Sequence, residues 1–374
     1  MFVGITNTPR DYAWGSTSAI AELFGKQPSG APEAELWLGA HAGSPARVVD
    51  PPSAGGAETL IGVLGDKRLP FLLKILAAAS PLSLQAHPTM AQAAVGFDRE
   101  NALGIPLDDP TRNYKDAFHK PEIIFALSER FDALCGFRPV AETRALLEPL
   151  GDVAAPLLDR LVDDSSLAAV FEWLISRGAG VDALTAAIVD AASKRPGTLA
   201  FSTVTLLADN YPGDPGILIS LLLNSVSLKR GEVLYLPAGN IHAYLDGLGV
   251  ELMAASDNVL RGGLTPKHVD VAELLSVLDF TPVPVPYLAP IAVTDGVDLF
   301  SPGVPDFELL HVTADAELAL DADAIVVCTS GSFTLAGANG SLSVALGEAV
   351  FISGESSVRV AGDGDLFVAT SAAA

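Results

Sequence analysis

The spacing of apolar residues changes twice along the chain. From residue 1 to about 140 the apolar segments are short and are separated by Gly and Pro, which is typical of β-strands joined by turns. From residue 141 to 222 aliphatic residues recur near helical spacing instead. The most regular of these stripes contains Leu167, Val170, Phe171, Leu174 and Ile175. From Asn224 the β-like texture returns, so the pattern predicts a mainly β protein with a helical insertion.

The second β region contains its own boundary. The stretch from Thr281 to Pro290 is rich in proline, which predicts a linker. Beyond it, residues 333–335, 341–344 and 348–352 alternate like the strands of a sandwich or a barrel. In the helical block we interpret the aliphatic stripes as packing surfaces and not as a cofactor-binding motif.

One weak internal repeat links the two parts of the second β region, before and after the linker. The segment that begins at Leu228 parallels the segment around Gly347, with Gly231 aligned on Gly347 and Glu232 on Glu348. The same offset places His242 over Val358. If both copies are barrels, only the first has kept a side chain that can bind a metal.

Composition excludes some classes of protein. The chain has 374 residues, and 49% of them are hydrophobic, which excludes a disordered chain. It carries 45 acidic and 22 basic residues, for a net charge of −23. Nucleic acids and anionic membranes attract basic surfaces, so we expect neither as a partner.

The negative charge is unevenly distributed. Residues 281–374 contain 12 acidic residues and a single basic residue, whereas residues 67–138 contain 9 basic and 8 acidic residues. A small phosphorylated substrate is therefore electrostatically reasonable near residues 67–138, although the chain as a whole is strongly negative.

Cysteine usage and hydropathy bear on the location of the protein. Cys135 and Cys328 are too few for a disulfide framework or a Cys-rich zinc site, and we interpret them as buried small residues. The first residues lack a basic segment followed by an apolar run, and the most apolar stretch is interrupted by Lys74 and Pro81. We expect a cytoplasmic protein without a membrane span.

The first segment that could carry chemistry runs from Pro81 to Pro88. Strict alternation places Ser83, Gln85 and His87 on one face of a strand. Such a strand could simply be half exposed. Alternatively, Gln85 and His87 point together at one metal ion.

The second segment runs from His119 to Ala126. In a strand, Lys120, Glu122 and Ile124 would share one face. Glu122 is then either a solvated residue at the end of a strand or a metal ligand.

The third segment has the most specific spacing. Gly231 is followed after five residues by Pro237-Ala-Gly-Asn-Ile-His242, which matches the G-x5-P-x-G-x2-H signature of cupin barrels. A Pro/Gly turn would end one strand, and the next would direct His242 into the barrel mouth. Tyr244 lies on the same strand face as His242. The usual pattern ends with Asn four residues after the His, where this chain has Asp246.

The fourth segment runs from Gly249 to His268. It places Arg261 directly before two glycines, which let the backbone approach a ligand closely. The planar guanidinium of Arg donates several fixed hydrogen bonds to a phosphate or to a developing oxyanion. A surface arginine in a loop is the other interpretation.

Together the first three segments supply two histidines, one glutamate and one glutamine. This set suits a divalent cation with an open position for water, zinc or iron more than calcium. Glutamine is an uncommon ligand, so composition alone does not select Gln85.

The combined motifs resemble the type I mannose-6-phosphate isomerase family. The runs that carry the resemblance occur in order from residue 12 to residue 268 and leave the last hundred residues unmatched. They are Tyr12-Ala-Trp-Gly-Ser, Glu35-Leu-Trp-Leu-Gly-Ala-His41, Leu84-Gln-Ala-His-Pro, His119-Lys-Pro-Glu, Cys135-Gly-Phe-Arg-Pro139, Pro237-Ala-Gly-Asn-Ile-His-Ala-Tyr244 and Asp257-Asn-Val-Leu-Arg-Gly-Gly-Leu-Thr-Pro-Lys-His268.

The resemblance implies an enzyme that interconverts mannose 6-phosphate and fructose 6-phosphate and binds one zinc ion per chain. By motif position, the zinc ligands would be Gln85, His87, Glu122 and His242. Arg261 would fall on the catalytic arginine of the family. The other polar groups of the cleft would be Lys120, Tyr244 and Glu251.

The chemistry of an aldose–ketose isomerase agrees with these roles. The reaction moves a proton between C2 and C1 through an enediol, so it needs a base and a cation or donors where negative charge develops. Arg261 could stabilise the enediolate, while Glu251, Tyr244, Lys120 and zinc-bound water remain candidates for the base. The candidates for binding the substrate and its phosphate are Ser83, Lys74, Lys267 and Trp14.

The predicted fold combines the spacing of apolar residues with the family resemblance. It consists of two cupin-like β-barrels, or jelly rolls, and one α-helical domain. Residues 1–140 and 223–285 would form a discontinuous catalytic domain, residues 141–222 the helical insertion, and residues 286–374 a C-terminal cupin-like domain without a metal site. We expect a monomer or a weak oligomer.

Two other functions fit the same ligands. A different cupin enzyme, such as a non-haem iron oxygenase, also uses two histidines and a carboxylate. A non-catalytic sugar-binding protein with two cupin barrels could retain the metal for structure. The sequence argues against the latter, because Lys120, Tyr244, Glu251 and Arg261 exceed what a structural metal site requires.

Overall fold

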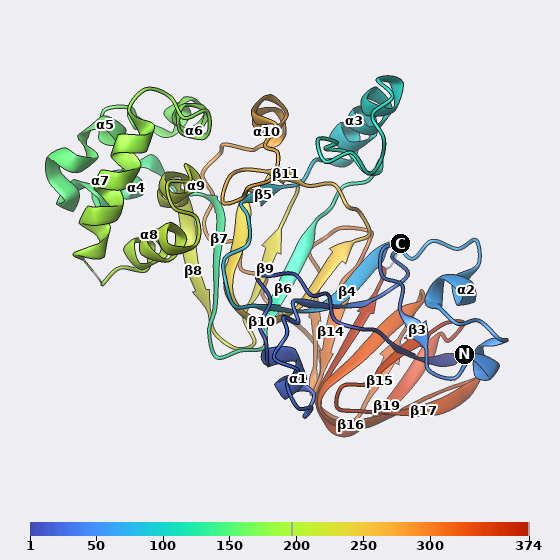
Figure 1. The fold of residues 1–374 in the computed structure, drawn as a ribbon. Helices are drawn as coiled ribbons and strands as arrows, with labels where there is room; N and C mark the ends of the chain where they lie inside the picture. Colours follow the sequence, from blue (N-terminus) through green and yellow to red (C-terminus); the bar gives the residue numbers. More distant parts are fainter. Residues whose placement is uncertain (196, 373–374) are drawn as a thin grey trace.

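Two antiparallel sheets and a group of helices make up the protein (Figure 1). The computed structural model describes residues 1–195 and 197–372. One sheet lies in the middle of the molecule, the sheet of C-terminal strands lies on one side of it, and helices α4–α9 gather on the other side. The mainly β fold with a helical insertion is confirmed.

The strands are numbered along the chain. The first half comprises β1 (Phe2–Thr6), β2 (Glu35–Leu38), β3 (Arg47–Val48), β4 (Phe71–Ala78), β5 (Gln85–Ala86), β6 (Glu122–Ala126), β7 (Phe131–Phe137), β8 (Leu223–Leu228), β9 (Val233–Leu236) and β10 (His242–Ala254). The second half comprises β11 (Leu260–Arg261), β12 (Ile291–Thr294), β13 (Val297–Phe300), β14 (Glu308–Val312), β15 (Ala316–Ala319), β16 (Ala324–Gly337), β17 (Gly340–Ala345), β18 (Ala349–Ile352) and β19 (Ser357–Thr370).

The helices follow the same numbering. They are α1 (Ala19–Leu23), α2 (Leu60–Leu64), α3 (Met90–Ala102), α4 (Val140–Leu147), α5 (Ala155–Leu158), α6 (Leu167–Ile175), α7 (Val181–Ser193), α8 (Leu199–Asn210), α9 (Gly216–Ile219) and α10 (Val271–Val277). Short 3-10 helices occupy Pro51–Ala54, Glu148–Ala154, Asp164–Ser166 and Ser220–Leu222.

The long strand β10 organises the middle sheet. Its first part pairs with β5 and β7, and its second part pairs with β4 and β6. This pairing places His242 opposite Gln85 and Glu251 opposite Lys74. Residues from distant parts of the chain thus become neighbours on one sheet.

The alternation predicted around Glu122 is confirmed in β6. Ile123 and Phe125 belong to the apolar core between the two sheets, whereas Ile124 and Ala126 belong to a separate cluster inside the middle sheet. Every residue of β6 is buried. A strand buried on both faces holds the side chain at its first position, Glu122, in a fixed direction.

The sheet of C-terminal strands also contains two strands from the start of the chain. β1 pairs with β18, so that Phe2 lies opposite Ile352, and on its other side β1 pairs with β3. The predicted division counts these residues with the catalytic unit, and that division stays a prediction. The sequence did not predict the pairing, because the alternating apolar residues of β1 indicate a strand but not its partner.

The internal repeat corresponds to two copies of one turn. The Glu232 carboxylate accepts a hydrogen bond from the amide of Lys229 at 2.8 Å, and Glu348 accepts one from the amide of Ala345 at 2.9 Å. Gly231 and Gly347 precede these glutamates with φ of 87° and 81°, a conformation that favours glycine. The turns lead into β9 and β18, respectively.

The helical block packs around its own core, as predicted. All five residues of the stripe from Leu167 to Ile175 are buried in one apolar cluster, together with aliphatic residues of α7, α8 and α9. The same cluster extends to Leu84 and Leu260, which flank the strands β5 and β11. The helices therefore buttress the edge of the middle sheet that carries Gln85.

The structure also contains helices outside the insertion, which the spacing of apolar residues did not predict. α1, α2 and α3 lie within residues 1–140, and α10 lies within residues 223–285. α3 buries only Ala93, Gly96 and Glu100, so its sequence lacks a stripe of large apolar residues. A capping box between Thr89 and Gln92 stabilises its start and is a local signal for this helix.

Two smaller predictions concern cysteines and membranes. Both cysteines are buried, as predicted, and burial raises the pKa of the Cys135 thiol to about 12. Among residues 1–195 and 197–372, no helix combines the length and apolar composition needed to cross a bilayer.

Truncation of Phe171 tests the core of the helical block. The ring is fully buried and lies 5.9 Å from Phe137 and 5.6 Å from Phe280, measured between ring centroids. We expect Phe171→Ala to lower the free energy of unfolding by about 3–5 kcal/mol, because it leaves a cavity among these rings. Urea denaturation followed by circular dichroism measures the change.

The matched control is Val162→Ala, at a side chain that is 74% exposed. This variant should stay within about 0.5 kcal/mol of the parent protein. A loss below about 1 kcal/mol for Phe171→Ala would contradict the assignment of this ring to the core.

Candidate active site

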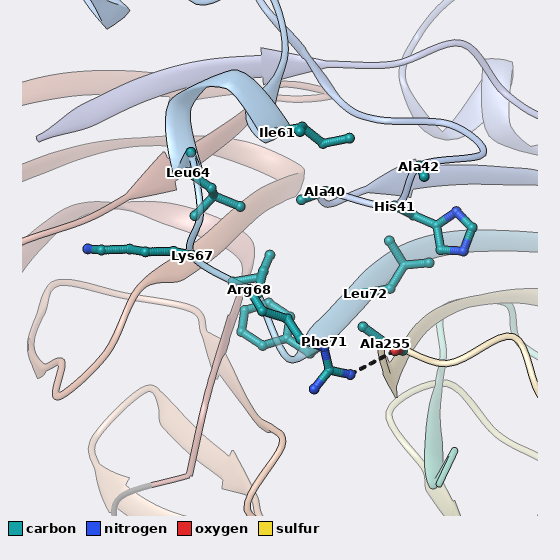
Figure 2. A pocket seen from close by; sticks show the side chains of 12 residues that line it. Ala40, His41, Ala42, Ile61, Leu64, Lys67, Arg68, Phe71, Leu72 and Ala255 are labelled. Carbon is teal, nitrogen blue, oxygen red and sulfur yellow. Dashed lines mark hydrogen bonds between the residues drawn. The ribbon is translucent and has the colours of Figure 1, made fainter. Parts of the chain in front are cut away.

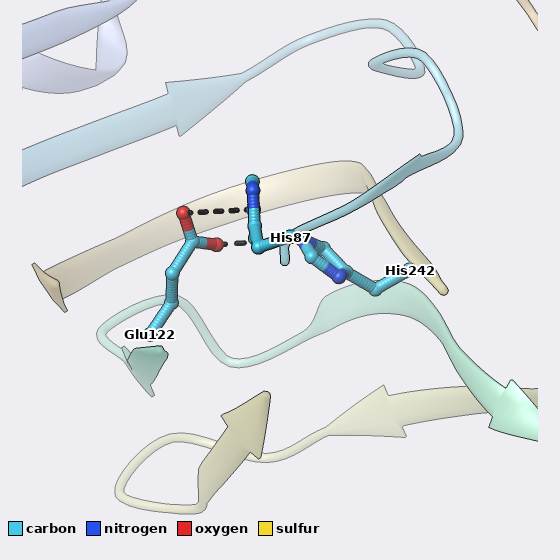
Figure 3. A group of neighbouring side chains, drawn as sticks. All are labelled: His87, Glu122 and His242. Carbon is cyan, nitrogen blue, oxygen red and sulfur yellow. Dashed lines mark ion pairs between the residues drawn. The ribbon is translucent and has the colours of Figure 1, made fainter. Parts of the chain in front are cut away.

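Three buried side chains meet where β5, β6 and β10 begin or end. The Nε2 atoms of His87 and His242 lie 3.3 Å from the two oxygens of Glu122, one on each (Figure 3). The ligand atoms of the three residues all fall within 4.8 Å of one another. The structure thus brings together residues that are 35 and 120 positions apart in sequence.

The hydrogen bonds of the two imidazoles fix which nitrogen carries the proton. His87 donates from Nδ1 to the carbonyl oxygen of Asn258 at 2.7 Å, and His242 donates from Nδ1 to that of Asn240 at 3.0 Å. A carbonyl oxygen only accepts, so the proton of each neutral ring is on Nδ1 and Nε2 is a lone-pair donor. Burial lowers the pKa of His87 to about 4, so that ring is neutral at pH 7.

This arrangement faces lone pairs toward lone pairs. With the ring proton on Nδ1, the Nε2 of an imidazole offers no proton to the Glu122 carboxylate, which itself only accepts. His87 Nε2 and Glu122 Oε2 are buried without a hydrogen-bond partner among the described residues. A divalent cation satisfies all of these atoms at once, so the three residues fit a metal centre.

Gln85 completes the set beside His242. Its side-chain amide nitrogen lies 3.2 Å from His242 Nε2. The oxygen and nitrogen of an amide exchange places by a half-turn of the side chain, which would present the carbonyl oxygen to the same point. The four residues predicted as ligands therefore lie together.

The charge of Glu122 is maintained by a neighbouring cation. Burial would raise the pKa of this carboxyl, but the positive charge of Lys120 opposes burial, and the pKa lies well below its usual range. Lys120 Nζ lies 3.0 Å from Glu122 Oε1. Glu122 is therefore ionised at neutral pH, as a metal ligand must be.

A second buried cluster lies on β4 and its neighbours. Lys74 Nζ lies 2.8 Å from Glu251 Oε2 on β10 and 3.2 Å from Glu35 Oε1 on β2. Burial alone would lower the pKa of Lys74, but the two carboxylates raise it well above its usual value. The amine is therefore a permanent cation, shared between two acids on the floor of the site and away from its rim.

Burial moves the pKa values of Glu251 and Tyr244 upward. For Glu251 the negative charges of Glu122 and Glu35 add to the effect of burial and outweigh the opposing charge of Lys74. For Tyr244 burial and the charge of Glu251 raise the pKa well above its usual value. Tyr244 is a neutral phenol, and Glu251 is a carboxyl with enhanced proton affinity.

One cavity of about 540 Å³ joins both clusters. Its lining includes the other residues predicted to be near the substrate: Trp14, Ser83, Lys120, Arg261 and Lys267. Gln85 and Glu122 also line it, whereas His87 and His242 lie behind its wall, almost fully buried. Every residue predicted for the site therefore lies in or directly behind a single cavity.

Arg261 and Lys267 are the cations of the cavity without an acidic partner. Neither side chain makes an ion pair with any residue in the described part of the chain, unlike Lys74 and Lys120. Burial, and then the charge of Arg261, lower the pKa of Lys267. Two unneutralised cations close together favour the binding of an anion.

Asn258 holds the loop that leads into β6. Its Oδ1 accepts from the amides of Lys115 and Asp116, and its Nδ2 donates to the carbonyl oxygens of Asp116 and Phe118. The side chain is fully buried. Since the backbone oxygen of Asn258 also accepts from His87, one residue orients a candidate ligand and the adjoining loop.

A smaller cavity of about 260 Å³ lies beside the large one (Figure 2). His41 lines the small cavity, and its Nε2 lies 2.8 Å from Asp257 Oδ2, a residue of the large cavity. In the small cavity Arg68 donates to the carbonyl oxygen of Ala255 at 3.0 Å. These bonds fix the segment before Arg261.

Sequence reasoning did not assign a role to several residues of the site. Glu35 lies in the large cavity and accepts a hydrogen bond from Trp37 Nε1 at 2.9 Å. The alternation in Glu35-Leu-Trp-Leu38 was the available signal, because Leu36 and Leu38 enter the core between the sheets. Asp257 and Tyr211 also line the cavity, and no local pattern distinguished them.

Comparison with known proteins gives consistent results. The family model for phosphomannose isomerase type I, catalytic domain, matches residues 2–140. The mannose-6-phosphate isomerase of Escherichia coli strain K12 is 40% identical over 385 residues, covering 97% of both chains. That of Homo sapiens is 33% identical over 385 residues, covering 86% of each.

Solved structures agree with the sequence relatives. A zinc-bound mannose 6-phosphate isomerase superposes with a TM-score of 0.90 at 34% identity, covering all of both chains. The apo form of the Salmonella typhimurium enzyme gives the same TM-score and identity, covering 100% of this chain and 99% of that one.

The fold and the site define a β-sheet protein with a buried His–Glu–His metal centre at the wall of a polar cavity. With relatives of this identity along nearly its whole length, the chain belongs to the type I mannose-6-phosphate isomerase family.

Substitution of Asn258 tests the framework of the site. Asn258→Ala removes the five hydrogen bonds that this fully buried side chain makes with residues 115–118. We expect a loss of about 2–4 kcal/mol in the free energy of unfolding of metal-free protein. Urea denaturation in the presence of a chelator measures this loss.

Asn210→Ala is the matched control, since this exposed amide makes a single bond, to the carbonyl oxygen of Leu206. Its effect should stay within about 0.5 kcal/mol. Equal stabilities of the two variants would show that the Asn258 network does not hold the loop.

Proposed function

We propose that this chain is a zinc-dependent isomerase that interconverts mannose 6-phosphate and fructose 6-phosphate. The observation that carries the proposal is the single cavity in which the metal-type cluster, a buried Lys–carboxylate cluster and two unpaired cations meet. Relatives that cover nearly the whole chain bear the name of this enzyme. They favour it over an iron oxygenase and over a non-catalytic sugar-binding protein.

Gln85, His87, Glu122 and His242 would hold one zinc ion. The support is chemical: two imidazole lone pairs and a carboxylate converge without a proton between them, next to an amide. When bound, zinc would supply positive charge that polarises oxygens of the substrate.

Glu251 is the residue that we assign to proton transfer between C1 and C2 of the open-chain sugar. Its raised pKa gives the carboxylate a higher affinity for a proton than that of an ordinary glutamate, which suits a group that takes up a proton and releases it again. The fixed cation Lys74 holds this carboxylate in place. Tyr244, a neutral phenol on the same cavity wall, would donate a hydrogen bond to a substrate oxygen.

Arg261 would stabilise the negative charge of the enediolate. Its guanidinium lines the cavity and has no acidic partner among the described residues, so it is available to an oxyanion. Lys120 would add positive charge next to Glu122. Unlike Glu251, neither residue needs to lose a proton in this scheme.

Lys267 and Ser83 are our candidates for binding the phosphate, with Trp14 packing against the sugar. Lys267 is a cation of the cavity without a partner, and the nearby charge of Arg261 adds to its attraction for a dianion. Lys74, also considered for this role, is neutralised by two carboxylates, and this favours a positioning role.

We keep the domain organisation predicted from the sequence as a proposal. Residues 1–140 with 223–285 would be the catalytic unit, 141–222 the helical unit and 286–374 a C-terminal unit without a metal site, the two sheets being related cupin barrels. The paired glutamate turns before β9 and β18 support a common origin of the sheets. Cytoplasmic location and a monomeric or weakly oligomeric state stay predictions from sequence.

Metal removal tests the proposed function. Zinc-loaded protein should convert mannose 6-phosphate to fructose 6-phosphate in a coupled assay. It should lose nearly all of this activity after chelation and recover it when zinc is restored, because the four side chains alone lack the charge that the metal supplies. Full activity in metal-stripped protein, with unchanged circular dichroism, would refute the proposal, as would oxygen consumption by an iron-loaded form in place of isomerisation.

Arg261→Ala tests the stabilisation of the enediolate. We expect kcat to fall about 100- to 1000-fold while the protein remains folded, as for the loss of an oxyanion donor. Steady-state kinetics and a thermal melt measure the two properties. Arg359→Ala, at an exposed arginine on β19, is the control and should leave both unchanged. An unaltered kcat in Arg261→Ala would remove the proposed role.

A further inference from the structure

The C-terminal sheet contacts the strand that carries Glu122 at both ends of that strand. At the far end of β6, the Phe125 ring packs against Phe300 and Phe367 with centroids 5.6 and 4.8 Å apart. At the near end, His119 Nε2 lies 2.7 Å from the Oδ2 atom of Asp306. Asp306 lies between β13 and β14.

Asp306 is a buried carboxylate with a single hydrogen-bonding contact. Its side chain is 8% exposed, and within residues 1–195 and 197–372 His119 is its only hydrogen-bond partner. Burying a carboxylate is costly unless it is paired. The C-terminal unit therefore contains a buried acid whose one side-chain hydrogen bond within the described residues is made to the neighbouring unit.

His119 transmits this contact to the cavity. It directly precedes Lys120, and the two side chains point to different places: His119 to Asp306 in the C-terminal unit, Lys120 to Glu122 at the cavity wall. The preceding residues are held by Asn258 through the carbonyl oxygen of Phe118. Because the chain is held at Phe118, before His119, the anchor of the imidazole bears on the direction of Lys120, the next residue.

We propose that Asp306 is a positioning residue through which the C-terminal sheet holds His119 and thereby sets Lys120 against Glu122. The C-terminal unit then completes the active site without contributing a side chain to the cavity. This inference rests on the proposed function for its kinetic readout, and on the proposed metal ligands for its spectroscopic one.

A second carboxylate at the same interface provides a matched control. Asp365 on β19 pairs with His311 at 2.8 Å and with Arg230 of the middle-sheet unit at 3.3 Å. Like Asp306, Asp365 pairs with a histidine and links the two units. Unlike Asp306, it makes no bond with the segment before Glu122. A purely structural contribution to the interface should thus be shared by Asp306 and Asp365.

The experiment compares Asp306→Ala, Asp306→Asn and Asp365→Ala in the full-length protein. The measurements are kcat and KM on zinc-loaded protein, zinc affinity by chelator competition, the absorption bands of the cobalt-substituted form, and the melting temperature. For Asp306→Ala we expect kcat to fall about 10-fold, with KM changed less than about 2-fold and shifted cobalt bands. Asp306→Asn keeps an oxygen that accepts from His119 and should restore kcat to within about 3-fold and the parent spectrum.

Asp365→Ala should lower the melting temperature at least as much as Asp306→Ala and leave kcat and the cobalt bands unchanged. The proposal is overturned if kcat and the bands of Asp306→Ala match those of the parent, if Asp365→Ala lowers kcat equally, or if Asp306→Asn fails to rescue. The cobalt spectrum requires no turnover. An inactive parent protein would therefore refute the isomerase and still leave the positioning role supported or overturned by the bands.

Discussion

The interaction on which the site depends is the convergence of buried lone pairs around Glu122. A carboxylate and two imidazole nitrogens, all acceptors, are held within 4.8 Å of one another on side chains that are almost fully buried. Such a cluster repels itself unless positive charge enters it. Much of the surrounding structure serves this constraint: β10 pairs with both β5 and β6, and backbone carbonyls fix each imidazole tautomer.

A second charge balance operates a few residues away. Lys74 lies between two buried acids and stays charged, while burial and the charges of Glu122 and Glu35 raise the proton affinity of Glu251. Proton transfer on a sugar requires a group that can both take up a proton and release it. The two clusters share a cavity because β10 carries His242 at one end and Glu251 near the other, with Tyr244 between them.

Sequence predicted the parts of the site that local patterns encode. Alternation oriented Glu122, the Pro/Gly turn placed His242, and helical spacing defined the core of the insertion. The roles of Glu35, Asp306 and β1 were not predictable, because each depends on a partner far along the chain, and alternation identifies a face but not a neighbour. α3 escaped prediction because it buries small residues and a paired glutamate, and hydrophobic periodicity detects neither.

The placement of β1 between β18 and β3 affects how the molecule is assembled. β1 and its partner β18 lie far apart in the sequence, so the sheet of C-terminal strands is complete only when these two distant segments have paired. Contacts of such long sequence separation form late and cost loop-closure entropy. The two sheets share one apolar core, so unfolding of either sheet exposes apolar residues of the other. We therefore expect the two sheets to resist partial unfolding as one cooperative body.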